Sequence, residues 1–534
     1  MPTPSEILAS QLAERGVKHA FGMPGGVVLP LIEAFERHGI EFVLVRHEGS
    51  AGFMADATAQ LTGAPGVCVA TLGPGATNLV SGLAGALLDR APVVAVTGQV
   101  DPGLANVYTH QTLDQRALFK PVCKHSVTLT AEQAWREIPL ALRHLELGRR
   151  GPIHLNIPAS VFTAEQPEAL PDRFVPAPVD HRVAMIDQAL PCLRAARRPV
   201  MLVGLSQLDE ALARVVGQLA ERFSMPVLST YKAKGVPNED HPWYAGSFGL
   251  STTVDLLQQQ LLATADLLLT VGLDPVELRP QWLPGWPSDL PVIALDRAAP
   301  HDLVHPLEQL YVGDIARNLS WLLQDEGGRS AWTLDELGRH WDRMAALFTE
   351  DTSEMGPAAA IAAIQTGFPD EGICALDVGA HRITASHVWT CRQPNTLLQS
   401  NGFSSMGYGL PAAIAARLAF PDRPAMALTG DMGLWMTLGE LGLAAERGLD
   451  LTVVYLADRS LSLIEIKQRR MGLRHSGVRF ENPDVVALAS AFGGTGVSVE
   501  EPEHLEQAVA QASARGGLQL IEARIDPAPY ATQI

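Results

Sequence analysis

The sequence predicts an α/β fold built from three doubly wound parallel sheets. Three observations lead to this fold class. Short apolar runs alternate with longer segments of helical periodicity, this alternation occurs in three successive sets, and the apolar runs are continuous, as in strands buried on both faces of a parallel sheet. A chain of 534 residues is expected to hold two to four domains. Each set occupies about 150 residues, a normal domain size.

The strand-like runs of each set can be read directly. The first set contains EFVLV, GVCVATLGPG and PVVAVTGQV, the second RPVMLVG, ADLLLTVG and LPVIALD, and the third GICALDVG, PAMALTGD, LTVVYLAD and LQLIEARI. A proline-rich segment over residues 159–180 separates the first set from the second. Residues 325–356, between the second and third, have a charged helical pattern instead of a loop-like one.

Composition narrows the class of protein. Apolar residues make up 47% of the chain and charged residues 18%, as in ordered globular proteins. The net charge of -18 disfavours a nucleic-acid or anionic-membrane surface. No uncharged apolar run reaches the roughly 18 residues of a membrane span, and the first residues lack the pattern of a signal peptide. Five widely spaced cysteines without a CxxC suggest buried thiols in a reducing compartment, and a cytoplasmic location follows by elimination.

Ligands of parallel sheets bind beyond the carboxyl ends of the strands. Glu48 follows EFVLV and precedes a helix that opens with small residues, which permit a close approach by a ligand or another chain. A carboxylate that stabilises the helix dipole is the alternative reading. The segment TLGPGATN also joins a strand to a helix, as a tight turn or an anion-binding helix start, but it lacks the Lys-Ser/Thr of a P-loop.

Two carboxylates follow neighbouring strands of the third set. Asp431 ends PAMALTGD and Asp458 ends LTVVYLAD, with one helix between them. Crossover geometry brings the ends of neighbouring parallel strands together, so the pair predicts a Mg²⁺–diphosphate site, with the Ser460 carbonyl as a further ligand. Two helix N-caps are the alternative. Met406, in the Gly- and Ser-rich loop SNGFSSMGYG, either supports a ligand or belongs to the core.

Taken in order, these motifs resemble the thiamine-diphosphate (ThDP) enzymes of the acetolactate synthase and pyruvate decarboxylase superfamily. The resemblance covers nearly the whole chain and is carried by FGMPGGVVLPLIEAF, RHEGSAGFMADATA, TLGPGATNLVSGLAGALLDRAPVVAVTGQV, GPIHLNIPASV and SMGYGLPAAIAARLAFPDRP. It implies a pyrimidine-binding domain over residues 1–168, a central domain over 179–325 and a diphosphate-binding domain over 357–534. THQTLDQRALFKPVCKHSV and VGLDPVELRPQW are similar to the catabolic, flavin-independent acetolactate synthases, so FAD is not expected.

The resemblance also implies roles for individual residues. Glu48 would bind the aminopyrimidine ring and promote its imino tautomer, which removes the C2 proton of the thiazolium. Met406 matches the residue that supports the bent cofactor, and Asp431, Asp458 and Ser460 match the Mg²⁺ ligands. Further cofactor-binding positions follow from the same motifs: Thr71, Gly75, Asn78, Gly379, His381, Gly402, Gly430, Met432 and Gly433. Gln111 is a second catalytic candidate, and the substrate candidates are Gly25, His110, Gln111, Lys124 and Leu463.

The implied reaction is the decarboxylation of a 2-oxo acid followed by attack of the resulting enamine on a second carbonyl. With pyruvate in both roles, the product is 2-acetolactate. Because the family builds its site between two subunits, a homodimer is the minimum assembly and a homotetramer is expected.

The sequence departs from the family pattern in three places. Met432 replaces the second Gly of the usual GDG, which requires a negative φ at this position. Asp458 stands where Asn is usual, and Leu461, Leu463, Ile464 and Lys467 replace the aromatic residues or Met that are frequent around the acceptor. A decarboxylase or a ThDP lyase with another donor or acceptor is therefore the alternative function, ahead of a non-catalytic homologue.

Overall fold

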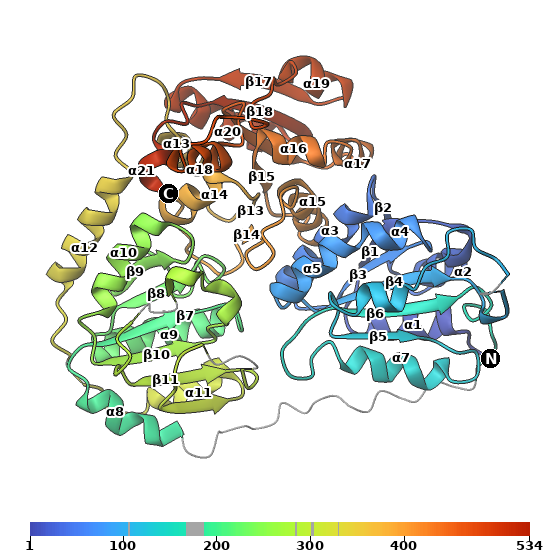
Figure 1. The fold of residues 1–534 in the computed structure, drawn as a ribbon, viewed down its shortest axis with the longest axis horizontal. Helices are drawn as coiled ribbons and strands as arrows, with labels where there is room; N and C mark the ends of the chain where they lie inside the picture. Colours follow the sequence, from blue (N-terminus) through green and yellow to red (C-terminus); the bar gives the residue numbers. More distant parts are fainter. Residues whose placement is uncertain (105–106, 167–185, 283–285, 301–303, 329) are drawn as a thin grey trace.

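The computed structural model describes residues 1–104, 107–166, 186–282, 286–300, 304–328 and 330–534. Three six-stranded sheets, all parallel, organise this described part of the chain. Helices cover both faces of each sheet (Figure 1). The predicted fold class is therefore confirmed. Among the described residues, no helix combines the length and the apolar character needed to cross a membrane.

The amino-terminal sheet has the strand order β2-β1-β3-β4-β6-β5. Its strands are β1 (His19–Met23), β2 (Glu41–Leu44), β3 (Gly66–Ala70), β4 (Val93–Gln99), β5 (His125–Thr128) and β6 (Ile153–Pro158). Its helices are α1 (Pro4–Glu14), α2 (Leu29–Arg37), α3 (Glu48–Thr62), α4 (Pro74–Asn78), α5 (Val80–Leu88), α6 (Gln115–Phe119) and α7 (Ala134–Arg143). Glu48 is the first residue of α3, as its position before the run of small residues suggested.

The central sheet has the order β12-β11-β10-β7-β8-β9. Its strands are β7 (Pro199–Val203), β8 (Val227–Thr230), β9 (Tyr244–Phe248), β10 (Leu267–Val271), β11 (Val292–Asp296) and β12 (Gln309–Val312). Its helices are α8 (Ala189–Ala195), α9 (Glu210–Phe223), α10 (Thr252–Leu262) and α11 (Ile315–Leu322). Helix α12 (Leu334–Leu347) lies in the charged segment that follows and starts at a capping box formed by Thr333 and Glu336.

The carboxyl-terminal sheet has the order β14-β13-β15-β16-β18-β17. Its strands are β13 (Ile373–Leu376), β14 (Leu397–Gln399), β15 (Ala425–Gly430), β16 (Leu451–Ala457), β17 (Thr495–Val499) and β18 (Leu518–Arg524). Its helices are α13 (Pro357–Gly367), α14 (Ala380–Val388), α15 (Gly409–Ala419), α16 (Asp431–Met436), α17 (Glu440–Glu446), α18 (Ser462–Arg470), α19 (Val485–Ala491), α20 (Pro502–Arg515) and α21 (Tyr530–Gln533).

Helices α3 and α15 join the amino- and carboxyl-terminal domains. They lie side by side at the centre of the molecule (Figure 1), and one continuous apolar core includes Phe53 and Met54 of α3 with Leu410 and Ile414 of α15. The almost complete burial of α3 explains its Ala- and Gly-rich sequence, because small side chains let two helices approach closely. The first turn of α3, which carries Glu48, is therefore held by both domains.

Candidate active site

Asp431 and Asp458 lie at the same edge of the carboxyl-terminal sheet. Strands β15 and β16 pair in parallel with Gly430 opposite Leu456, so the two carboxylates follow neighbouring strand ends. Burial and, next to it, the charge of Asp431 together raise the pKa of Asp458 to about 7. Burial also raises the pKa of Asp431. Asp431 is buried and Asp458 half-buried, and two such carboxylates that repel each other form a site that a divalent cation would stabilise.

Asp431 is held by neutral donors on both of its oxygens. Its Oδ1 accepts the backbone N–H of Met432 at 2.9 Å. Its Oδ2 accepts the backbone N–H of Arg459 at 2.9 Å and the Nδ2 amide of Asn482 at 3.2 Å. Since no donor in this set carries a charge, the negative charge of Asp431 stays available to a cation. Asn482 is a site residue that the motifs did not identify.

Asp458 is oriented by the segment that follows it. Its Oδ1 accepts the backbone N–H of Ser460 at 3.0 Å and its Oδ2 accepts the Ser462 hydroxyl at 2.6 Å. Within the described residues, no group of three or more His, Cys, Asp or Glu side chains forms a metal cluster. This donor set fits Mg²⁺ completed by a carbonyl, phosphate oxygens and water, since Mg²⁺ is held by few carboxylates.

Asp377, which directly follows β13, is buried at this edge of the sheet and hydrogen-bonds the chain segments around it. It is 1% exposed and accepts the backbone N–H groups of Gly407 and Tyr408 at 3.1 and 3.0 Å and the Thr429 hydroxyl at 3.0 Å. A Cβ atom on Gly433 would overlap Asp377 Oδ2. The glycine at position 433 is therefore required by packing.

His381 forms a second wall of the site. A Cβ atom on Gly430 would lie 3.3 Å from the imidazole, and a Cβ on Gly379 would lie 2.6 Å from it. Burial lowers the pKa of His381 to about 3, so the ring is neutral. Its Nε2 is buried and has no hydrogen-bond partner among the described residues. A buried polar atom of this kind beside bare glycine backbone fits a site that receives a polar ligand.

Met432 and the Met406 loop complete this edge. Met432 lies within α16 and is not among the described residues with positive φ, so the backbone condition for Met at this position is met. Met406 is half-buried. Gly402, in the same loop, donates its N–H to Asp89 Oδ1 at 2.7 Å, which attaches the loop to the amino-terminal domain.

Glu48 lies in a separate cluster at the edge of the amino-terminal sheet. Asn78 Nδ2 donates to Glu48 Oε2 at 2.9 Å, and a Cβ atom on Gly75 would lie 3.1 Å from Glu48 Oε1. Thr71 borders both Gly75 and Gly25, because a Cβ atom on either glycine would contact its side chain. The structure thus groups four of the predicted residues with Glu48, whose carboxylate belongs to a residue that is 6% exposed.

The remaining candidates of this domain are more scattered. Gln111 has a φ of 56° and its backbone lies against Gly73, whereas His110 is exposed. Lys124 Nζ donates to the carbonyls of His144 and Leu147 at 2.6 and 2.9 Å, so the side chain points toward the segment that follows α7. Burial lowers its pKa to about 8.

Gln115 was not predicted, yet it organises the turn between β3 and α4. Its Oε1 accepts the N–H of Gly73 at 2.9 Å, and its Nε2 donates to the Gly98 carbonyl and to Asn156 Oδ1 at 2.8 Å each. The side chain is fully buried. No motif identified it, because its partners are distant in sequence.

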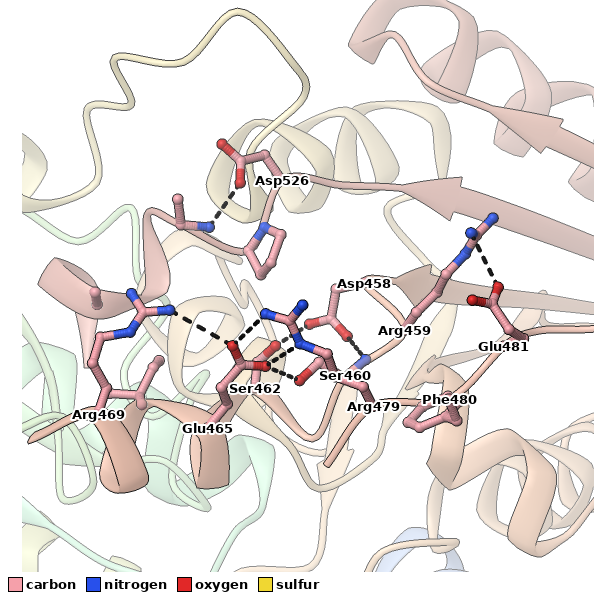
Figure 2. A pocket seen from close by; sticks show the side chains of 14 residues that line it. Asp458, Arg459, Ser460, Ser462, Glu465, Arg469, Arg479, Phe480, Glu481 and Asp526 are labelled. Atoms are coloured by element: carbon pink, nitrogen blue, oxygen red, sulfur yellow. Dashed lines mark hydrogen bonds and ion pairs between the residues drawn. The ribbon is translucent and has the colours of Figure 1, made fainter. Parts of the chain in front are cut away.

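A cavity of about 720 Å³ opens beside Asp458 and Ser460 (Figure 2). Glu465 of α18 lies at its rim, where it accepts from the Ser460 hydroxyl at 2.6 Å and pairs with Arg479 at 2.8 Å. These contacts lower the pKa of Glu465 to about 2, with Arg479 as the largest cause. Leu463, on the same helix, packs against the carboxyl-terminal core, and Ile464 is 43% exposed.

Comparison with family models covers the three domains. Residues 2–118 match the thiamine pyrophosphate enzyme N-terminal TPP binding domain, residues 186–322 the central domain, and residues 377–523 the C-terminal TPP binding domain. The matched segments contain Glu48, Asp431 and Asp458 together with the strands that precede them.

Curated relatives align with nearly the full chain. An acetolactate synthase of Bacillus subtilis (strain 168) is 31% identical over 98% of this chain and 93% of its own length. The large subunit of acetolactate synthase isozyme 3 of Escherichia coli (strain K12) is 29% identical over 95% of this chain and 92% of its own length. This chain belongs to the thiamine-diphosphate-dependent enzymes of the acetolactate synthase type.

Proposed function

We propose that this enzyme decarboxylates a 2-oxo acid, with pyruvate as the leading substrate, and joins the remaining fragment to a second carbonyl. With pyruvate as donor and acceptor, the product is 2-acetolactate. The observation that carries this proposal is the pair of carboxylates at adjoining strand ends, buried Asp431 and half-buried Asp458, with only neutral donors on their oxygens. The printed names of the relatives, which are acetolactate synthases, support the choice of substrate.

The residues of the carboxyl-terminal edge fit the diphosphate end of the cofactor. Asp431, Asp458 and the Ser460 carbonyl would hold Mg²⁺, which would neutralise the negative charge of the diphosphate. Gly379, Gly430 and His381 would border the diphosphate, because they present bare backbone and an unpartnered ring nitrogen. Met432 and Gly433 continue the same wall, and Met406 and Gly402 belong to the loop that would support the cofactor's centre.

ThDP supplies the chemistry that stabilises the carbanion formed when CO₂ leaves. Glu48 would share a proton with the aminopyrimidine ring, and its burial together with the Asn78 hydrogen bond holds its carboxylate in one orientation. Thr71, Gly75 and Asn78 would border that ring. Gln111 would act on the substrate, with Gly25, His110, Lys124 and Leu463 as the further substrate residues.

The contacts of Glu48 described above lie within the amino-terminal domain. A complete site is therefore proposed to form between Glu48 of one chain and the Asp431 edge of another, in a homodimer that pairs into a homotetramer. The domain boundaries at 1–168, 179–325 and 357–534, a cytoplasmic location and a reaction without FAD belong to the same proposal.

Product identification tests the proposed reaction. The protein is incubated with ThDP, Mg²⁺ and a panel of 2-oxo acids and aldehydes, and each product is identified. The proposal predicts that pyruvate gives mainly 2-acetolactate. A predominance of acetaldehyde would reject the carboligase in favour of a decarboxylase, and turnover of another 2-oxo acid without turnover of pyruvate would indicate a lyase with a different donor. That second candidate is favoured by α18, where Leu463 and Ile464 stand in a region in which the family resemblance implies aromatic residues or Met.

A further inference from the structure

Glu440 is a buried acid that the proposed site does not use. It is the first residue of α17 and is 1% exposed. A turn of three residues separates it from α16, the helix that begins at Asp431. Buried carboxylates are costly unless hydrogen bonds satisfy them, so the partners of Glu440 indicate why it is there.

Those partners belong to the other cofactor-binding domain. Glu440 Oε1 accepts the backbone N–H of Arg46 at 3.0 Å, across 394 residues of sequence. Burial raises the pKa of Glu440, whereas the Ser50 hydroxyl and the backbone N–H groups of Arg46 and His47 lower it. The carboxylate of Glu440 thus faces the residues on both sides of Glu48.

The same turn of chain is also fixed from within. His47 is the N-cap of α3, and its Nδ1 accepts the N–H of Gly49 at 3.0 Å. Glu440 binds the N–H two residues before Glu48, and hydrogen bonds to a charged acceptor are stronger than neutral ones. Together, these contacts fix the backbone on which the Glu48 carboxylate is carried.

A second acid of α17, Glu446, contacts the side chain of Arg46 and not its backbone. Glu446 pairs with the guanidinium of Arg46 at the surface, where the two side chains are 63% and 31% exposed. Exposed pairs of this kind contribute little. Variants of Glu440 and Glu446 therefore distinguish the effect of binding the Arg46 backbone from the effect of binding the Arg46 side chain.

We infer that Glu440 is a positioning residue, which holds the backbone that carries Glu48 and ties it to the α16–α17 segment that begins at Asp431 of the same chain. This role rests on the proposed function, in which Glu48 acts on the cofactor's aminopyrimidine ring. A displacement of about 1 Å at a reacting group can lower a rate by about 100-fold. Glu440 thus acts on the rate of proton removal from the cofactor and leaves the cofactor's binding unchanged.

The test measures deuterium exchange at C2 of ThDP bound to the full-length protein with saturating Mg²⁺. We expect Glu440→Ala to lower the exchange rate by about 10- to 100-fold, in line with the cost of mispositioning. Glu440→Gln keeps an acceptor oxygen and should restore part of the rate. Glu446→Ala is the matched control and should exchange at the wild-type rate. Calorimetry should give all four proteins similar ThDP·Mg²⁺ affinities.

Three results would overturn the inference. The first is a folded Glu440→Ala protein that exchanges at the wild-type rate. The second is a loss of exchange that only follows weaker cofactor binding or a lower unfolding midpoint, since a merely structural role would give that pattern. If the Glu440→Ala protein does not fold, the Glu440→Gln protein is measured in its place. A wild-type rate of C2 exchange in Glu440→Gln is then the third result that contradicts the inference. A wild-type protein that binds no ThDP, or binds it without C2 exchange, overturns the proposed function itself.

Discussion

Replacing Lys232 with Met should destabilise the whole chain, because Lys232 lies where the three domains meet. Its Nζ is 3.1 Å from Asp89 Oδ2 and donates to the Gln399 carbonyl at 2.6 Å. The two side chains of the pair are 5% and 0% exposed. Asp89 also accepts the N–H groups of Asn401 and Gly402, so the Lys232→Met protein keeps a buried charge without its cation. Removing one partner of a buried pair costs about 3–5 kcal/mol.

Chemical denaturation of Lys232→Met measures that cost against an exposed control pair. Arg392 and Asp240 are 48% and 55% exposed, so Arg392→Met should cost less than about 1 kcal/mol. The double variant Lys232→Met, Asp89→Asn removes both charges and should be more stable than Lys232→Met alone. A Lys232→Met protein as stable as Arg392→Met would refute the reasoning, because a buried charge would then have lost its partner without penalty.

Three further changes test the site and its surroundings. Asp458→Asn should keep ThDP·Mg²⁺ affinity within about tenfold by calorimetry, since both side chains offer an oxygen; loss of all cofactor binding would show that the second charge is essential. Gly433→Ala should lose about 1–3 kcal/mol in denaturation, because its Cβ overlaps Asp377, while Gly338→Ala, with open space around it, should not; equal stability would disprove the packing argument. Burial raises the pKa of Glu277 from 4.5 to about 8, so between these values the folded chain holds a proton that the unfolded chain releases, and stability should fall by up to about 1.4 kcal/mol per pH unit as pH rises. Glu277→Gln should flatten this dependence between about pH 5 and 8, and an unchanged slope would assign the effect to other groups.

The sequence predicted the edge of the carboxyl-terminal sheet well, for a physical reason. A right-handed crossover between neighbouring parallel strands leaves few places for the residues that follow them, so Asp431 and Asp458 had to lie near each other. The strand-like run EFVLV and the small residues that follow it placed Glu48 at the start of a helix after β2. Periodicity also indicated a helix between the second and third domains, where α12 lies.

Residues that act through distant partners escaped prediction. Asp377 ends a strand like many other acids, and its importance depends on Gly407, Tyr408 and Thr429, which pack around it only in the folded chain. Glu440 reads as an ordinary acid in the first turn of a helix, and its partner lies 394 residues away.

The direction of a long side chain is equally hidden from a sequence motif. Lys124 stays a predicted substrate residue, and only the structure shows that its ammonium group donates to the carbonyls of His144 and Leu147. Four methylene groups give such a side chain a long reach, and the neighbours that settle its direction come from another part of the chain.

Pyruvate consumption by Glu48→Gln tests the central claim most directly. Glu48 is buried, accepts a hydrogen bond from Asn78 and is distant in sequence from Asp431 and Asp458, so this change should remove the proposed proton partner and leave the proposed diphosphate end intact. Calorimetry with ThDP and Mg²⁺ establishes that the variant is loaded with cofactor. The account predicts near-normal cofactor affinity with pyruvate consumption lowered by at least about 100-fold. A loaded Glu48→Gln protein that consumes pyruvate at a near-normal rate would contradict it.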